Sequence, residues 1–287
     1  MRLRMAHWKY RTQIRLRSSA ISHPDVDKEA DFMQQKVALV TGAGRGIGVG
    51  IALKLADAGY DVGVHYAVSR EGAEEVAAEI RSRGRKAITL QADIKQVNEV
   101  RAMVDQFVDH FGRIDVLVNN AGITKFAHIL ETEEEEFDEV FGTDLKGAYF
   151  CTQQAARHMV RLGIKGVIVH NSSNHSVGCW PNATVYAAAK AGVNKMTMNM
   201  ALDLAKYDIR VVAIAPGYTH KQLDPPAMSE GANAIASRIP MGRFCTPQEV
   251  GDAVVYLTSA SAGYITGTTL FMDGGALLPV VAQNEFS

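Results

Sequence analysis

The stretch KVALVTGAGRGIG, Lys36–Gly48, decides the fold. It begins with a short apolar run, which predicts a buried strand. The glycines after it permit a tight turn and a close approach of the backbone to a pyrophosphate. The helix predicted over about 46–58 would add free N–H groups and its positive dipole end. A turn that only packs is the alternative, but its position after the first strand favours a dinucleotide site.

The rest of the chain alternates short apolar runs with longer helical segments. Alternation of this kind predicts βαβ units with right-handed crossovers. We therefore expect an α/β fold with a single Rossmann-type doubly wound parallel sheet of about seven strands and helices on both faces. The acidic run over 131–141 predicts a helix start, with Thr132 and Glu135 as a capping box. The predicted strands span 36–40, 60–66, 86–93, 114–122, 166–173, 209–217 and 268–275.

The beginning of the chain differs from the remainder. Six Lys and Arg residues precede the first acidic residue, and an Arg-rich, acid-poor start with serines is similar to a transit peptide. The alternative, which we favour, is that residues 1–32 are a disordered or upstream-translated extension. We then expect residues 33–287 to form one Rossmann-type domain, since no linker or low-complexity tract divides them.

Composition narrows the class of protein. Hydrophobic residues make up 47% of the chain and the formal net charge is −1, so nothing indicates a nucleic-acid partner. The sequence contains no run of 18 or more apolar residues, so we predict no membrane span. The three cysteines are scattered, which favours reduced thiols and a cytoplasmic protein. No His/Asp cluster has ligand spacing, so we expect no metal.

The second strand indicates which dinucleotide is bound. Sites that prefer NAD usually end this strand with an acidic residue on the ribose hydroxyls. Here His65, Tyr66 and Ser69 stand in that region, and Arg45 lies inside the glycine turn. A guanidinium grips a 2′-phosphate, whereas a carboxylate repels it, so NADP(H) is favoured over NAD(H). Asp93 after the third strand would reach the adenine, or would cap the next helix.

The stretch TVYAAAKAG, Thr184–Gly192, raises a separate question. Alanine is the best helix former, so Tyr186 and Lys190 project from one helix face, one turn apart. On spacing alone, an ordinary surface helix would explain the pair. A free phenol ionises only near pH 10, and a cation within about 4 Å makes ionisation much easier. The pair is therefore a candidate proton donor.

Several motifs then occur in a fixed order. The glycine turn follows the first strand, NNAG (119–122) ends the fourth, Ser173 ends the fifth and precedes the Tyr–Lys pair, and APG (215–217) ends the sixth. This order resembles that of the short-chain dehydrogenase/reductase family over about residues 36–275. The resemblance implies an NAD(P)-dependent enzyme that interconverts a secondary alcohol and a carbonyl by hydride transfer.

The resemblance also implies roles for individual residues. Tyr186 would be the general acid/base, Lys190 would support it and hold the nicotinamide ribose, and Ser173 would hydrogen-bond the reacting oxygen. The residues expected to bind the cofactor are Gly42, Arg45, Gly46, Ile47, Gly48, Tyr66, Asp93, Ile94, Asn119, Asn120, Ala121, Gly122, Tyr186, Lys190, Pro216, Gly217 and Thr219.

Three positions depart from the family pattern. Asp144 stands where an Asn usually helps to fix a water in the proton relay, so we count it with the catalytic set. Its carboxylate would perturb the titration of the Tyr–Lys pair. Val212 replaces another Asn, and Lys221 takes the place of a Thr, although Thr219 is close. A cofactor-binding regulator without turnover therefore stays open as a different class of function.

The substrate is indicated less clearly. His175, Trp180 and Asn182, together with Ser173 and Tyr186, would contact it, and a segment over about 218–240 would form a mobile lid. The sequence is similar both to sugar (glucose 1-) dehydrogenases and to 3-oxoacyl-carrier-protein reductases. The polar side chains favour a sugar or polyol, with a 3-oxoacyl group or small ketone as the alternative. Family members usually form tetramers through two long helices, so a homotetramer is expected.

Overall fold

The computed structural model describes residues 35–225 and 227–278. The predicted extension, residues 1–32, lies outside these ranges. The strands are β1 (Val37–Val40), β2 (Asp61–Tyr66), β3 (Ala87–Gln91), β4 (Val116–Asn119), β5 (Val167–Asn171), β6 (Arg210–Pro216) and β7 (Thr269–Met272). The α-helices are α2 (Ile47–Asp57), α3 (Arg70–Ser82), α4 (Val97–Phe111), α5 (Glu134–Val140), α6 (Ala148–Leu162), α7 (Thr184–Ala205), α8 (Glu230–Ala236) and α9 (Pro247–Thr258). A π-helical segment, η1 (Phe141–Gly147), joins α5 to α6, and short 3₁₀ turns occur at η2 (Asn174–Ser176) and η3 (Ala260–Ala262).

The strands form one parallel sheet in the order β3-β2-β1-β4-β5-β6-β7. The predicted seven-stranded, doubly wound fold is therefore confirmed. Chain order reverses between β1 and β4, and in open α/β sheets ligands bind beyond the carboxyl ends of the strands at such a point. The glycine turn after β1 and the NNAG loop after β4 meet there.

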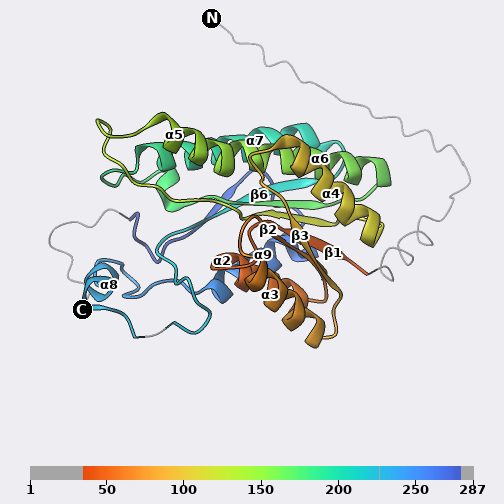
Figure 1. Cartoon of the computed structure of the whole chain (residues 1–287), viewed down its shortest axis with the longest axis horizontal. Coiled ribbons are helices and arrows are strands. Elements are labelled where there is room, and N and C mark those ends of the chain that lie inside the picture. Colours follow the sequence, from red (N-terminus) through yellow and green to blue (C-terminus); the bar gives the residue numbers. More distant parts are fainter. Residues whose placement is uncertain (1–34, 226, 279–287) are drawn as a thin grey trace, which may run out of the picture. The chain divides into compact units, whose positions relative to one another are not determined.

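Helices cover both faces of the sheet, as Figure 1 shows, with α4, α6 and α7 on one side and α2, α3 and α9 on the other. Successive strand residues face opposite layers. Val40 packs with Ile51 of α2, while Leu39 packs in the second core with Phe107 of α4. Both faces of the sheet are buried under helices, which explains why the strands are apolar throughout.

The capping box predicted at Thr132 and Glu135 is wrong. Helix α5 begins at Glu134, and its N-cap residue makes no side-chain capping bond. The Thr132 hydroxyl instead donates to the His128 carbonyl, 3.1 Å away, so the preceding turn uses the group that would have capped the helix. A capping box does occur at α9, where the Thr246 side chain accepts from the Glu249 N–H and Glu249 accepts from the Thr246 N–H.

Across the described residues, no helix is both long enough and apolar enough to span a bilayer. The longest helix, α7, has 22 residues but carries Lys190 and other polar side chains along its length.

Candidate active site

The glycine turn after β1 is shaped to admit a ligand. Gly42 and Gly46 have φ near +60°, which L side chains rarely adopt, and a Cβ on Gly48 would lie 2.3 Å from the Gly42 carbonyl oxygen. A Cβ on Gly46, by contrast, would meet no atom within 4 Å, so the turn is open there. Helix α2 has no side-chain cap and no acidic residue in its first turn. Its N–H groups are thus available to the pyrophosphate of a dinucleotide.

His65 supports this turn from beneath. The Gly42 N–H donates to His65 Nδ1 at 3.0 Å, and the other ring nitrogen lies 3.0 Å from the Ala92 carbonyl oxygen. The side chain is only 1% exposed, and burial lowers the pKa of His65, so the imidazole is neutral at pH 7. The sequence placed His65 at the ribose end of the site. The structure corrects this, because its ring is committed to the turn.

Two further predicted cofactor residues are also turned inward. The Tyr66 ring is 7% exposed and packs in the core under α2 and α3, which leaves its main chain to meet a ligand. The Asn119 amide donates to Thr152 Oγ1 on α6, 2.8 Å away, and is buried. This side chain has a structural role in the described geometry, and the expected contact of Asn119 with the cofactor stays a prediction.

Asn120 joins the glycine turn to the strands beside it. Its side-chain amide donates to the carbonyls of Thr41 and Gly42 at 2.9 and 3.1 Å. Its Oδ1 accepts from Asn171 at the end of β5, at 2.9 Å. The turn, the NNAG loop and the end of β5 are therefore held together by amide hydrogen bonds.

The remaining predicted cofactor positions surround the same edge of the sheet. Arg45 is exposed and, within the described residues, makes no side-chain hydrogen bond or ion pair. Asp93 accepts from the Lys95 N–H at 3.0 Å, while α4 takes Gln96 as its N-cap, so the helix-capping alternative for Asp93 is wrong. Gly217 pairs through its N–H with the Met272 carbonyl. The other positions at this edge are Ile47, Ile94, Ala121, Gly122, Pro216 and Thr219.

Ser173, Tyr186 and Lys190 meet at the end of β5. Tyr186 is half-buried in the first turn of α7, with Lys190 Nζ 5.6 Å from the centre of its ring. Lys190 Nζ donates to the Asn171 carbonyl at 2.9 Å, which ties α7 to β5. Ser173 Oγ accepts from the His175 N–H, whereas Ser172 turns the other way and donates to the Lys190 carbonyl. This arrangement presents a hydroxyl and a phenol beside a buried cation.

Asp144 adds a second buried charge. Its Oδ2 lies 3.1 Å from Lys190 Nζ, and its Oδ1 accepts from the Ile123 N–H at 2.8 Å. Lys190 is 5% exposed and Asp144 2%. Burial acts to lower the pKa of Lys190, but the charges of Asp144 and Tyr186 outweigh it, and the pKa lies above its ordinary value. Lys190 is therefore cationic at neutral pH.

A stack of rings stands beside Tyr186. His175 lies between Trp180, 4.0 Å away and nearly parallel, and Phe126, 5.8 Å away. The centres of the His175 and Tyr186 rings are 5.3 Å apart, in an edge-on arrangement. The predicted residues His175 and Trp180 are thus beside the Tyr, whereas Asn182 is exposed in a left-handed backbone conformation. Phe126 was not anticipated, since its loop carries no periodic signal.

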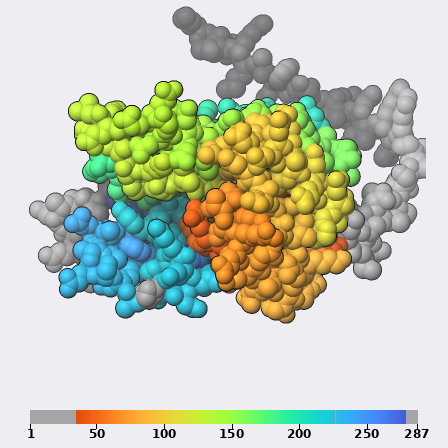
Figure 2. All heavy atoms as spheres, viewed as in Figure 1, coloured from red at the N-terminus to blue at the C-terminus, as the bar shows by residue number. Residues whose placement is uncertain are grey.

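The segment predicted as a lid contains α8, and Pro226 within it is outside the described residues. Figure 2 shows the α8 region and the α5 region on the same side of the molecule, with a hollow between them. Of the departures from the family pattern, Val212 is fully buried in β6 and suits the core there. Lys221 is exposed. No group of three or more His, Cys, Asp or Glu residues in the described ranges could hold a metal.

Comparisons with known proteins agree with this geometry. A family model described as Enoyl-(Acyl carrier protein) reductase matches residues 42–276. The 3-oxoacyl-[acyl-carrier-protein] reductase FabG of Staphylococcus aureus (strain Mu50) is 41% identical over 240 residues, which cover 84% of this chain and 97% of that protein. The 2-dehydro-3-deoxy-D-gluconate 5-dehydrogenase of Escherichia coli (strain K12) is 38% identical, covering 85% and 96%. A crystal structure of acetoin dehydrogenase YohF from Salmonella typhimurium has a TM-score of 0.81 at 34% identity, covering 88% and 99%.

The chain belongs to the short-chain dehydrogenase/reductase family. It is an oxidoreductase, and its family implies a nicotinamide dinucleotide as cofactor.

Proposed function

We propose that this enzyme interconverts a carbonyl and a secondary alcohol with NADP(H), and that Ser173, Tyr186 and Lys190 carry the chemistry. The observation that supports this most strongly is the placement of a half-buried phenol and a buried, cationic lysine on one face of α7. Ser173 lies at the adjoining end of β5. The three groups stand at the carboxyl edge of the sheet, beside the open glycine turn.

A nicotinamide cofactor, held beside the open glycine turn and Lys190, would supply the hydride that reduces the carbonyl carbon. Tyr186 donates the phenolic proton to the carbonyl oxygen, so that one hydride and one proton convert C=O into CH–OH. Ser173 Oγ donates a hydrogen bond to the same oxygen while charge develops on it. Lys190 stabilises the phenolate left behind, and a proton from solvent restores the phenol. Oxidation of the alcohol reverses each transfer.

Arg45 supports the proposed preference for NADP(H). Its guanidinium is exposed beside the glycine turn with no partner in the described part of the chain. His65 and Tyr66 have no carboxylate for a ribose hydroxyl, and both side chains are buried. An unpaired guanidinium favours a 2′-phosphate through bidentate hydrogen bonds.

The ring stack bears on the substrate. A sugar would need several hydrogen-bonding side chains beside Tyr186, but Phe126, His175 and Trp180 offer mostly flat apolar surface, and Phe126 and Val177 are exposed. Burial lowers the pKa of His175, which therefore carries no charge at neutral pH. We place a small ketone or 3-oxoacyl group first, the two alternatives that the FabG and acetoin dehydrogenase relatives exemplify. A sugar acid or polyol is the second candidate, supported by the similarity to the gluconate dehydrogenase.

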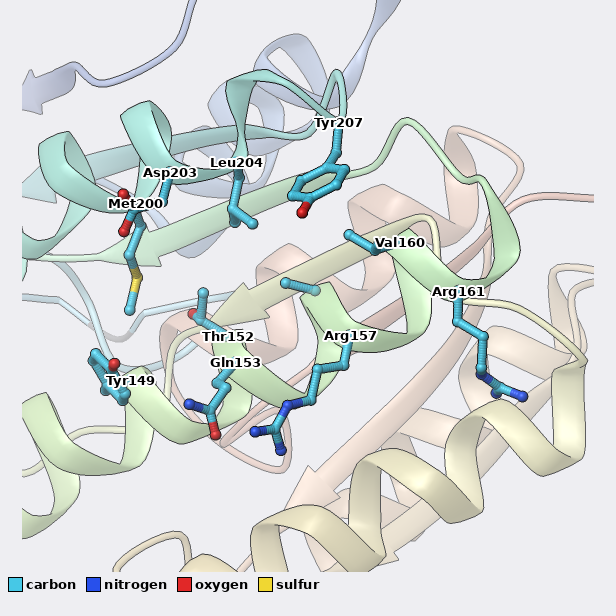
Figure 3. Close-up of a pocket in the computed structure, with 11 residues that line it drawn as sticks. Tyr149, Thr152, Gln153, Arg157, Val160, Arg161, Met200, Asp203, Leu204 and Tyr207 are labelled. Atoms are coloured by element: carbon cyan, nitrogen blue, oxygen red, sulfur yellow. The ribbon is translucent and has the colours of Figure 1, made fainter.

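The proposed homo-oligomer would use the groove between α6 and α7. Figure 3 shows side chains of both helices facing across it, with Arg157 and Arg161 along α6. Tyr149, Val160 and Tyr207 in this groove are 40–43% exposed. A second copy of the chain would cover it. Replacing Leu204 with Glu should then reduce the mass measured by light scattering, whereas an unchanged mass would argue against this interface. A cytoplasmic location is part of the same proposal.

The test is a kinetic assay with matched variants. Purified enzyme is mixed with NADPH or NADH and with acetoin, a 3-oxoacyl thioester or an aldose, and nicotinamide absorbance is followed. Tyr186→Phe should lower kcat by about 10²–10⁴-fold while dinucleotide affinity is kept. Arg45→Ala should weaken the binding of NADPH by about tenfold or more, as expected for a lost charge-assisted hydrogen bond. The affinity for NADH should be unchanged. Full turnover in Tyr186→Phe would overturn the proposed role.

A further inference from the structure

The buried pair Lys190–Asp144 has a feature that the proposed chemistry does not use. A lysine that supports a phenolate needs only its own positive charge, yet here a carboxylate lies 3.1 Å from it and both side chains are almost fully buried. Removing two charges from water is costly unless each is well paired. Asp144 Oδ1 accepts from the Ile123 N–H, whereas its buried Oδ2 has no hydrogen bond and is offset by the charge of Lys190 alone.

The charged and titratable groups around Lys190 lie on four elements: α7 itself, η1, β5 and η2. Tyr186 lies one turn back on α7, and Asp144 lies on η1. From β5 come the Asn171 carbonyl and His170. Burial, and to a smaller extent the charge of Lys190, lowers the pKa of His170 to about 3, so it is neutral. His175 on η2 is also uncharged at neutral pH, since burial lowers its pKa.

The remaining charges near η1 are on its outer side. Lys95 packs against Gly142 and pairs with Asp93 and Glu139. Lys125 also pairs with Glu139, and these side chains are 35–42% exposed to solvent. Solvent screens such pairs. Of the groups named here, Asp144 is therefore the one buried negative charge on Lys190 besides an ionised Tyr186.

We propose that Asp144 offsets the charge of Lys190 and thereby keeps the Tyr186 phenol protonated to higher pH, which poises the site for carbonyl reduction at neutral pH. The proposal rests on the proposed function of the Ser–Tyr–Lys set. Asp144 acts through Lys190 and is a positioning residue in this sense. A neutral side chain at 144 would leave the full lysine charge to the phenolate.

The direction and size of the effect follow from the arrangement. A charge within about 4–6 Å typically moves a titration by about 1–3 pH units. Asp144 contacts Lys190 directly and reaches the phenol only across it, so we expect about one unit. While Lys190 is protonated, removing the negative charge of Asp144 favours the phenolate. Alcohol oxidation needs phenolate as base, so its activity should then begin at lower pH. Carbonyl reduction needs the phenol, so the pH above which the rate of reduction declines should also move down.

The test compares Asp144→Asn with the wild type. Asn has the same shape, and its Oδ1 still accepts from the Ile123 N–H. The pH profile of kcat for alcohol oxidation should keep its form while its acidic midpoint moves down by about one unit. Glu139→Gln is the matched control, because it removes one negative charge at an exposed ion pair on α5, the helix that leads into η1. Its midpoint should stay in place.

A second readout does not depend on turnover. The phenolate absorbance of Tyr186 is obtained as the ultraviolet titration difference between each protein and its Tyr186→Phe partner. It should rise at lower pH in the Asp144→Asn background. An unchanged or higher midpoint in this titration overturns the proposal, even if no substrate is turned over. Loss of turnover with the shift present would instead count against the proposed function alone. If the Asn variant does not fold, Asp144→Ser removes the same charge and is judged by the same shift.

Discussion

Replacing His65 with Leu would test how the glycine turn is held. The change keeps a side chain of similar bulk but leaves the Gly42 N–H and the Ala92 carbonyl without their ring partners, both at 3.0 Å in the wild type. The site is 1% exposed, so water cannot replace the lost bonds without rearrangement. A buried polar group left without a partner costs about 1–3 kcal/mol. For two groups we expect the free energy of unfolding to fall by about 2–6 kcal/mol.

Urea unfolding followed by circular dichroism measures this loss, and quenching of Trp fluorescence by NADPH measures dinucleotide affinity. Two further variants separate the bonds. His65→Asn places an oxygen near the Nδ1 position and should restore the bond from Gly42, and with it most of the affinity. His65→Gln places an amide nitrogen near Nε2 and should restore only the bond to Ala92. Loss of less than about 1 kcal/mol in the Leu variant, with unchanged affinity, would refute the reasoning.

The pH dependence of the same variants gives an internal check. Burial lowers the pKa of His65 below its ordinary value of 6.5, so the unfolded chain binds the proton more readily than the folded protein. The contribution of His65 is therefore present above pH 6.5 and is lost as the pH falls below it. The stability gap between the wild type and the Leu variant should narrow in this range.

Two further predictions concern α9. Gly50→Ala should destabilise the protein by about 1–3 kcal/mol, because the new Cβ would lie 2.3 Å from the Pro247 carbonyl oxygen at the start of α9. Gly231→Ala in α8 is the control, because a Cβ there meets nothing within 4 Å. The control variant should not lower the melting temperature. Hydrogen bonds from Arg243, which outweigh burial, lower the pKa of Glu249 to about 2, so its stabilising effect should be present above pH 4.5 and disappear as the pH falls through 2. Urea unfolding of Glu249→Gln should accordingly differ from the wild type at pH 6 and converge with it in acid, and a constant gap would contradict the assignment.

The sheet and the central site were predictable because their signals are local. Apolar runs with short spacings marked the strands, and the four-residue step from Tyr186 to Lys190 needed only helical geometry. His65 and Asn119 show where this fails. Each side chain was placed by its position at a strand end, yet neighbouring strand residues alternate between faces, and both point into the protein. The sequence does not show which hydrogen-bonding group lies beside each face of the strand.

Phe126 illustrates the other limit. It reaches the ring stack because the Ala127 N–H donates to the Asn182 carbonyl, 3.0 Å away, which joins two loops distant in sequence. No periodic pattern announces such a pairing. Asp144 was recognised from its position in the family pattern, but its direct contact with Lys190 depends on the π-helical geometry of η1.

The π-helical geometry of η1 makes the site sensitive to the length of this segment. A π turn holds one more residue than an α turn, and such turns are frequent at functional sites. Deleting a single residue between Asp144 and Gly147 would let α5 and α6 merge into one regular helix. Every side chain on the amino-terminal side of the deletion would then swing around the axis, and Asp144 would leave Lys190. A change in the length of η1 would thus separate the two buried charges, even if every side chain that remained were unchanged.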